Sequence, residues 1–395
     1  MKKLINHFIY LNAHKGFFAL LFVYAILLFG VIYTSGYRHL DKMGIVLASI
    51  VLIYLMLGKF VKTDRIQRLN FSFLNERKLN TILFLTCIII FVFDMLILDG
   101  PPVLKTIGMK TVKEFTELRN GIHADSPTIM VYLSGFNIKG LLPFAIFHFL
   151  YKKNKTFSIV LILIASFYAF SMMQKSFIIA VLLPAIIYSI FTKKYLQLSA
   201  LSATIVAVVL SLTFMLNNLI EEENIQEKGK VTTDLPLIVR VFVGLSERIF
   251  VTPGLTVKEW FEIVPKQKPY LMGDGYPFLA KLRGREYRDY SKELFEIVKP
   301  EFAKQGLKGT VNVASFVREY ADFGYLGLFL GGAILSFLIF FVDRLFIGYP
   351  IQFLSLNLFP ILLVSSSSIL TILFSGGWAL ILLLFLVYKK QYKTI

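Results

Sequence analysis

The sequence predicts an all-α polytopic membrane protein with about ten transmembrane helices and a large, partly helical extracytoplasmic loop. Of its 395 residues, 56% are hydrophobic and only 17% are charged, which is too apolar for a water-soluble globular protein. The apolar residues also occur in blocks of roughly twenty, the length that a helix needs to cross about 30 Å of hydrocarbon. Lipid is therefore the expected solvent for most of this chain.

Ten such blocks follow one another along the sequence, and each predicts one spanning helix. They are residues 17–34, 43–59, 80–98, 129–151, 156–173, 175–191, 197–217, 324–342, 347–366 and 370–388. The segment Met1–Lys15 lacks a small-residue cleavage site, so the first block is expected to be a retained helix and not a signal peptide. The blocks divide the chain into residues 1–217 with seven helices, a loop at 218–311, and residues 312–395 with three helices. A shorter outer loop is expected at 99–128.

The charges indicate how the helices are oriented. The formal net charge is +17, and the segments predicted inside carry nearly all of it, opposed only by Asp64, Glu76 and Asp343. The basic residues of these segments are Lys2, Lys3, Lys15, Lys59, Lys62, Arg65, Arg68, Arg77, Lys78, Lys152, Lys153, Lys155, Lys193, Lys194, Arg344, Lys389, Lys390 and Lys393. This positive-inside pattern predicts that both termini are cytoplasmic, and it argues against nucleic acid as a partner. The single cysteine, Cys87, excludes a disulfide within the chain.

The loop at 218–311 carries the first candidate residues. Its segment 235–251, LPLIVRVFVGLSERIFV, places Arg240 and Arg248 on the polar side of an amphipathic helix expected at the outer membrane interface. Arginine binds phosphate well because its planar fork makes two parallel hydrogen bonds. Both residues are therefore candidates for holding a phosphorylated lipid at head-group depth. The alternative is that they extend to solvent or pair with Glu247.

Further basic residues lie near the predicted outer face. Arg119, in the loop at 99–128, is a candidate phosphate ligand, although Glu114 and Glu117 are close enough in sequence to be ordinary salt-bridge partners. Lys175 lies in a tight outer turn beside Gln174, a candidate sugar contact. A lone basic residue in such a turn can also serve only to anchor the helix at the interface.

Two charged residues fall inside the apolar blocks, where a charge is costly and usually has a partner in the bundle interior. They are Asp94 and Lys139. Lys139 is a candidate for substrate binding, and an internal ion pair with Asp94 is the alternative.

The segment that closes the large loop could supply acid–base chemistry. On a helix, Asn312, Ser315, Glu319 and Asp322 share one stripe with Arg318 beside it. A carboxylate there could deprotonate an acceptor hydroxyl. The alternative is an i,i+4 ion pair between Arg318 and Asp322 in a stripe that only caps the helix. Two carboxylates are too few for a hard-metal site, so no metal is expected.

The layout of the whole chain resembles the Wzy-type O-antigen and capsule polymerases, which join oligosaccharide repeat units in bacteria. The resemblance rests on the ten or more helices, the QKS turn at 174–176, the loop opening with the Arg240 and Arg248 helix, and NVASFVREYADFGYLG at its end. It implies transfer of a glycan from undecaprenyl pyrophosphate onto a lipid-linked repeat unit at the outer face of the bacterial inner membrane. Arg240, Arg248, Arg119 and Lys175 would hold the pyrophosphate.

The lipid pyrophosphate is an already activated leaving group, so the resemblance implies neither a nucleotide sugar nor another cofactor. Membrane lipid and the lipid-linked oligosaccharide are the expected partners, and whether a chain-length regulator protein also binds is left open. The candidate catalytic residues are Arg240, Arg248, Glu319 and Asp322. The candidate substrate-binding residues are Arg119, Lys139, Gln174, Lys175 and Arg318.

Three other functions fit parts of the pattern. An O-antigen ligase would share the architecture and the donor, but ligases use a histidine in the large loop, and residues 218–311 contain none. A flippase or transporter rarely needs so long an outer loop and commonly shows internal repeats, which this sequence lacks. A membrane scaffold without chemistry would tolerate alanine at the outer arginines. The absence of Walker A, HExxH and related motifs argues against ATP-driven pumps and zinc hydrolases.

Overall fold

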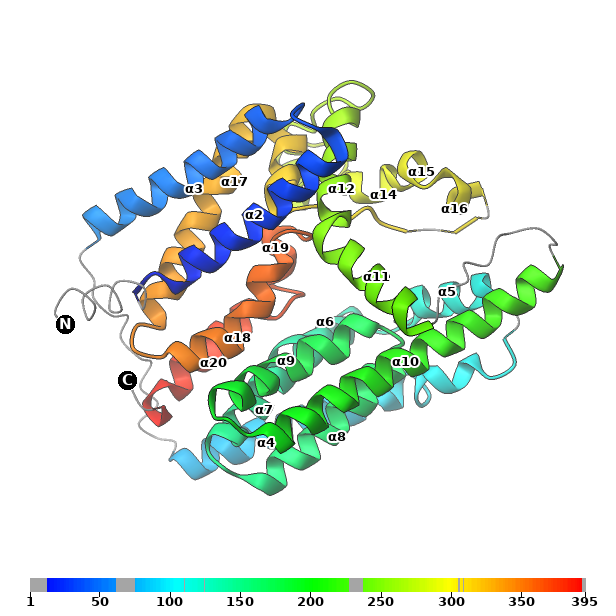
Figure 1. Cartoon of the computed structure of the whole chain (residues 1–395), viewed down its shortest axis with the longest axis vertical. Helices are drawn as coiled ribbons and strands as arrows, with labels where there is room; N and C mark the ends of the chain where they lie inside the picture. Colours follow the sequence, from blue (N-terminus) through cyan, green and yellow to red (C-terminus); the bar gives the residue numbers. More distant parts are fainter. Residues whose placement is uncertain are drawn as a thin grey trace. The chain divides into compact units, whose positions relative to one another are not determined.

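The computed structural model describes residues 13–61, 75–109, 111–123, 125–226, 237–304, 306–307 and 309–392. Within these ranges all regular secondary structure is helical, as the sequence predicts (Figure 1). The chain folds into two compact units that do not follow its order. The first unit comprises Met1–Ile66, Thr233–Gly348 and Pro360–Ile372, and the second comprises Gln67–Thr232, Tyr349–Phe359 and Leu373–Ile395.

Six helical segments in the described part of the chain are long and apolar enough to cross a membrane. Three of them are the single helices α2 (Lys15–Ser35), α3 (Leu40–Phe60) and α17 (Ser315–Leu345), and a fourth is Tyr195–Met215, the first part of α10 (Tyr195–Gln226). The fifth, Glu76–Thr106, contains α4 (Glu76–Ile97) and η1 (Pro102–Thr106). The sixth, Thr128–Tyr151, contains α6 (Thr128–Phe136), η2 (Asn137–Leu141) and α7 (Leu142–Tyr151). The chain is therefore a helical membrane protein, as its composition indicates.

The remaining predicted blocks form shorter helices. Three apolar helices have 10 to 17 residues, namely α8 (Lys155–Ser171), α9 (Lys175–Phe191) and α18 (Pro350–Leu363). The last block, predicted as one helix at 370–388, is divided into α19 (Ile369–Leu373) and α20 (Trp378–Tyr388). The break runs from the end of α19 at Leu373 to Gly377, the N-cap residue of α20, whose φ of 74° is left-handed.

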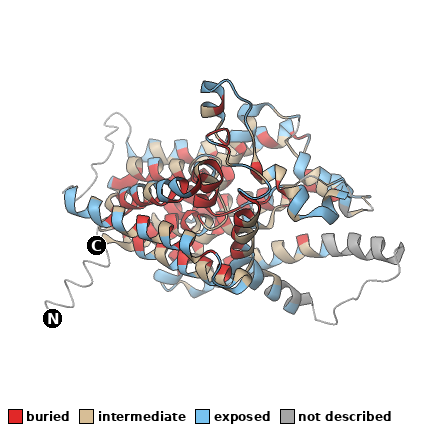
Figure 2. Ribbon diagram, turned by 90° about the horizontal axis from the view of Figure 1, so that it is seen from above, coloured by how far each residue is buried: buried red, intermediate tan, exposed pale blue. Residues whose placement is uncertain are grey.

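In the first unit, α2, α3 and α17 lie side by side, and α12 (Thr252–Ile263) packs on α2 (Figure 1). Glycines allow these close approaches. A Cβ added to Gly254 would collide with the backbone of Gly30 on α2, and one added to Gly332 on α17 would collide with Ser49 on α3. Elsewhere these helices expose large apolar side chains such as Phe22, which suits helices that meet lipid. Figure 2 shows that exposed and buried positions alternate along the helices.

A buried carboxylate joins the ends of two helices in this unit. Asp343, near the end of α17, accepts hydrogen bonds from the backbone N–H groups of Gly16 (2.6 Å) and Phe17 (3.1 Å) and from the hydroxyl of Tyr54 (2.6 Å). The N-cap residue of α2, His14, makes no side-chain cap hydrogen bond. Asp343 thus supplies from α17 the acceptor that the first turn of α2 lacks.

The second unit is built from α4 and α6 to α10, with α20 packed against η2. Two of its buried side chains, Trp378 and His148, are hydrogen-bonded to other side chains. The indole Nε1 of Trp378 donates to Asn357 Oδ1 (2.8 Å), while His148 is hydrogen-bonded to Tyr392 (2.8 Å) and Asn80 (3.0 Å). These pairs satisfy buried groups that would otherwise be costly in an apolar interior.

The long segment that precedes α17 is partly helical, as predicted. It contains α11 (Leu237–Phe250), α12, α13 (Pro277–Leu282), α14 (Tyr290–Glu293), α15 (Phe295–Val298) and α16 (Pro300–Lys304). Besides packing on α2 through α12, this segment contacts a kink in α17. Gly324 has a φ of 62° there, and the ring of Tyr270 lies about 3.2 Å from where its Cβ would be. The kink separates the first turns of α17, residues 315–323, from the rest of the helix. These turns form the base of the candidate site.

Candidate functional site

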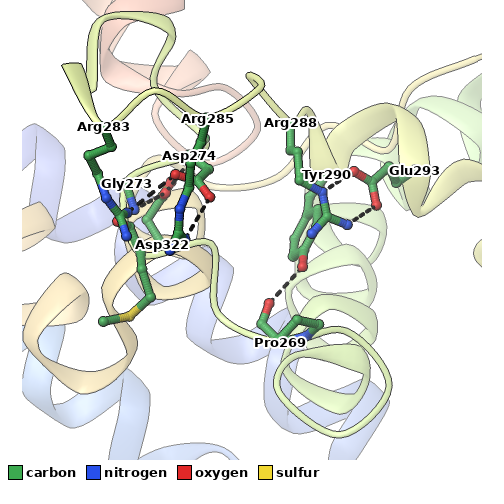
Figure 3. Close-up of polar contacts among 11 residues, drawn as sticks. Pro269, Gly273, Asp274, Arg283, Arg285, Arg288, Tyr290, Glu293 and Asp322 are labelled. Carbon is green, nitrogen blue, oxygen red and sulfur yellow. Dashed lines mark hydrogen bonds and ion pairs between the residues drawn. The ribbon is translucent and has the colours of Figure 1, made fainter. Parts of the chain in front are cut away.

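A glycine-rich turn, GDGYP at 273–277, docks on the first turns of α17 through Asp322. The backbone N–H groups of Gly273 and Gly275 both donate to Asp322 Oδ1 at 3.1 Å, and the N–H of Met272 donates to the Asp322 carbonyl at 2.8 Å (Figure 3). The turn needs its glycines. Gly273 has a φ of 100°, and a Cβ on Gly275 would collide with the Asp322 carboxylate. Asp322 is therefore the residue that fixes this turn.

Two arginines close the turn from its other side. Asp274 accepts hydrogen bonds from Arg283 (3.2 Å) and Arg285 (3.4 Å), and Arg283 also donates to the carbonyl of Met272 (Figure 3). Burial alone would raise the pKa of Asp274, but the hydrogen bonds from Arg283 and Arg285 outweigh it and leave this pKa below its ordinary value. The segment from 272 to 285 is thus held closed by charge.

A second ion-pair network orders the chain that follows. Arg288 makes a bidentate pair with Glu293, Nε to Oε1 at 3.0 Å and Nη2 to Oε2 at 2.8 Å (Figure 3). Lys268 also donates to Glu293 at 3.1 Å. The hydroxyl of Tyr290 donates to the carbonyl of Pro269 at 2.6 Å. Burial would raise the pKa of Glu293, but the hydrogen bonds from Arg288 and Lys268 lower it overall.

This network predicts an acid-sensitive loop. Because the folded-state pKa of Glu293 lies below its unfolded value, its stabilisation is complete above about pH 5 and is lost as the pH falls through the folded value. The groups are partly exposed, so the contribution is expected to be under about 1 kcal/mol, or roughly 1–3 °C in melting temperature. Melting Glu293→Gln and wild type in detergent between pH 3 and 7 should show the wild-type advantage only above about pH 5.

Glu296→Gln, at an exposed glutamate on the next turn, is the control and should follow wild type throughout. A Glu293→Gln deficit that persists unchanged at pH 3 would contradict this assignment.

Residues of the two networks and of the start of α17 line a polar cavity of about 210 Å³. All of its lining residues belong to the first unit. They are Trp260, Leu271, Gly275, Tyr287, Arg288, Asp289, Tyr290, Ser291, Val311, Asn312, Val313, Arg318, Ala321, Asp322, Ser367, Ser368 and Thr371. The cavity therefore combines two arginines, two aspartates, three aromatic rings and several hydroxyl groups.

Arg318 forms one wall of the cavity without pairing to Asp322. Its guanidinium donates to the carbonyl of Gly275 (2.5 Å) and to Ser368 Oγ (3.3 Å), and it lies 5.0 Å from the centre of the Tyr276 ring. The i,i+4 ion pair that the sequence left open is therefore not formed. The physical reason is that the turn amides occupy Asp322 Oδ1, while Arg318 reaches across to the same turn and to the segment before α19.

Glu319 and Asp322, the two candidate carboxylates, are both buried at the start of α17. Tyr276 donates to Glu319 Oε1 at 2.8 Å. Among the described residues, Glu319 Oε2 and Asp322 Oδ2 have no hydrogen-bond partner, and only Asp322 belongs to the cavity lining. Asn312 also lines the cavity, but α17 begins at Ser315, so Asn312 precedes the helix and does not continue the predicted stripe.

Apart from Arg318 and Asp322, none of the candidates with a described side chain lines the cavity. Arg240 and Arg248 lie on α11 in the first unit; Arg248 is exposed, and the side chain of Arg240 is outside the described part. In the second unit, Arg119 lies on α5 (Val112–Gly121), and Gln174 and Lys175 form the N-cap and first residue of α9. Arg119, Gln174 and Lys175 thus belong to a different unit from Arg318, Glu319 and Asp322.

The ion pair considered between Lys139 and Asp94 does not form. Asp94 Oδ2 instead accepts hydrogen bonds from Ser134 (2.9 Å) and Tyr168 (2.5 Å), and Asp94 Oδ1 lies 3.9 Å from His123 Nδ1. Lys139 lies on the π-helical turn η2, and its ammonium group is 5.3 Å from the centre of the Phe177 ring. Neighbouring hydroxyls thus stabilise the carboxylate, and an aromatic face contacts the cation.

Sequence reasoning missed several cavity residues. Trp260, Arg288 and Asp289 were not candidates, nor was the serine run that contributes Ser367 and Ser368. The stretch RGREYRDYS at 283–291 carried a usable signal, because charged residues interleaved with tyrosines in a long loop are typical of polar binding sites. The serines could not be selected from the sequence, since they are far along the chain from the loop they join.

The chain was compared with protein-family models, with curated proteins and with solved structures, and none of them matches it.

Proposed function

We propose that this protein is a polysaccharide polymerase, a glycosyltransferase that transfers an undecaprenyl-pyrophosphate-linked glycan onto a lipid-linked repeat unit. In this proposal it has about ten transmembrane helices in the bacterial inner membrane, with both termini in the cytoplasm and residues 218–311 on the outer side. The observation that carries the proposal is the polar cavity at the start of a membrane-spanning helix, whose lining combines Asp322 with arginine, hydroxyl and indole side chains. Such a lining suits a polyhydroxylated substrate delivered by a membrane lipid.

The chemistry needs three things from the protein. An acceptor hydroxyl attacks the anomeric carbon, the bond from that carbon to the pyrophosphate oxygen breaks, and the hydroxyl proton passes to a carboxylate. Asp322 or Glu319 is the proposed proton acceptor, because both are buried at the start of α17. The lipid pyrophosphate leaves with the bonding electron pair, so its growing negative charge needs cations.

The proposed cations are those selected from the sequence. Arg240 and Arg248 on α11 would stabilise the leaving pyrophosphate, with Arg119 and Lys175 as further ligands. Lys139, Gln174 and Arg318 are the proposed substrate-binding residues. Support for Arg240 and Arg248 is that α11 forms where the sequence places an interfacial amphipathic helix.

The test is polymerisation in a defined system. Purified protein in nanodiscs is given a lipid-pyrophosphate-linked repeat unit, and the product is resolved as a gel ladder. Wild type should give a ladder, and Arg240→Ala should lose it by about 100-fold or more in rate, the effect of removing a group that stabilises transition-state charge.

The control is Arg77→Ala, which removes an exposed arginine at the predicted inner end of α4 and should keep the ladder. Folding of each variant is checked by its melting temperature. If wild type makes no ladder from the correct repeat unit, the polymerase proposal fails. A single transfer to a lipid A core instead would identify a ligase.

A further inference from the structure

Two buried side chains of the cavity lining each carry a polar atom without a hydrogen-bond partner among the described residues. Trp260 is 3% exposed and Asp322 is 0% exposed, and both line the cavity. Neither Trp260 Nε1, a donor, nor Asp322 Oδ2, an acceptor, has a hydrogen-bond partner in the described ranges. Leaving such groups unsatisfied typically costs about 1–3 kcal/mol each, so a bound molecule that offers both an acceptor and a donor would be favoured.

The charges of the lining argue for a neutral molecule. Arg288 and Arg318 are balanced by Asp289 and Asp322. The arginines are also already engaged, Arg288 with Glu293 and Arg318 with the carbonyl of Gly275 and with Ser368. A diphosphate entering this cavity would meet two carboxylates and no arginine left without a hydrogen bond, which is unfavourable in a site of low dielectric.

The rest of the lining suits a ring that carries hydroxyl groups. Each hydroxyl can donate and accept, which matches one unpartnered donor and one unpartnered acceptor. The cavity volume of about 210 Å³ is roughly seven times the share of a water molecule, a space of the order of one pyranose ring. The indole of Trp260 and the rings of Tyr287 and Tyr290 add aromatic faces for the ring C–H groups.

We infer that this cavity is a subsite for one neutral sugar ring, in which Trp260 Nε1 donates to one oxygen of the sugar and Asp322 Oδ2 accepts from one of its hydroxyls. Pyrophosphate is excluded from it and is bound elsewhere. The inference rests on the proposed function for the identity of the glycan, but the binding of a free sugar can be measured without it. Trp260 is then a specificity-determining residue.

The chain provides a direct optical probe. Its only two tryptophans are Trp260 and Trp378, and Trp378 belongs to the second unit, where its Nε1 is hydrogen-bonded to Asn357. The protein in nanodiscs is titrated with methyl glycosides of neutral hexoses and N-acetylhexosamines, and separately with inorganic pyrophosphate. Indole fluorescence and saturation-transfer difference NMR are recorded for wild type, Trp260→Phe and Trp378→Phe.

At least one neutral glycoside should bind saturably and change the emission of wild type and of Trp378→Phe. In Trp260→Phe, which keeps an aromatic ring but loses the N–H, the emission change should vanish and the NMR affinity should fall by about 5- to 10-fold, the effect of losing one hydrogen bond. Asp322→Asn, which replaces the acceptor by an amide, should weaken binding to a similar extent. Pyrophosphate should not compete with the glycoside.

Three results would overturn the subsite: no glycoside of the panel binds, Trp260→Phe binds as wild type does, or pyrophosphate displaces the sugar. Failure of the subsite and failure of the polymerase are separable. Sugar binding without a ladder refutes the polymerase and leaves the subsite. A ladder whose repeat-unit KM is unchanged in Trp260→Phe refutes the subsite and leaves the polymerase.

Discussion

Asp322→Ala is expected to lower the unfolding free energy by about 3–5 kcal/mol and to abolish sugar binding. The substitution removes a carboxylate oxygen that accepts from two backbone amides, Gly273 and Gly275, and each such charge-assisted bond typically contributes about 1.5–3 kcal/mol. Both N–H groups would then lie buried without an acceptor. Thermal melting of the purified protein in detergent, followed by intrinsic fluorescence, measures the loss.

Asp322→Asn separates the two roles of this residue. The amide oxygen of asparagine can still accept from the turn, so the loss of stability should be only about 1–2 kcal/mol, while the amide nitrogen at the cavity side can no longer accept from a substrate hydroxyl. Gly275→Ala tests the same contact from the other side, because its Cβ would collide with the Asp322 carboxylate. An Asp322→Ala protein that melts with wild type would show that the turn does not depend on this residue.

The helices could be predicted from the sequence because their cause is local. Each apolar block must satisfy its backbone hydrogen bonds internally when lipid surrounds it, and only a helix does so. The six described segments that are long and apolar enough to span a membrane accordingly fall on predicted blocks, including α2, α3 and α17. The division of the last block at Gly377 was missed, since a hydropathy pattern does not reveal which glycine adopts a left-handed backbone.

The candidate site was predictable only in part. The sequence selected Arg318, Glu319 and Asp322 from helical spacing, and these three do lie together at the start of α17. Their partners could not be inferred, because a spacing rule favours the nearest charge, whereas Asp322 binds the amides of a turn about 50 residues earlier and Arg318 binds Ser368 about 50 residues later. Nothing in the sequence marked Trp260 as a site residue, and only the structure places it in the cavity lining.

Asp343 also binds groups that are far away in the sequence, although the sequence presents it as an ordinary acidic residue at the inner end of a helix. Asp343→Ala is expected to lower the unfolding free energy by about 3–5 kcal/mol. It removes the acceptor of three buried donors, the N–H groups of Gly16 and Phe17 and the hydroxyl of Tyr54. Melting in nanodiscs, with hydrogen exchange of the Gly16 and Phe17 amides, measures both the global and the local effect.

The neighbouring residue supplies a matched control for Asp343. Arg344→Ala removes a half-buried side chain that lies over the face of Phe340 and accepts none of these hydrogen bonds, so it should cost no more than about 1 kcal/mol. Asp343→Asn should fall between the two, because its amide oxygen can accept from the first turn of α2 but loses the charge that favours a helix N-terminus. Equal melting temperatures for Asp343→Ala and Arg344→Ala, with unchanged exchange at Gly16, would show that α2 does not need its cap. The expected order would instead establish that the first spanning helix is held by a residue more than 300 positions later, so that α2 gains its full stability only after α17 has been made.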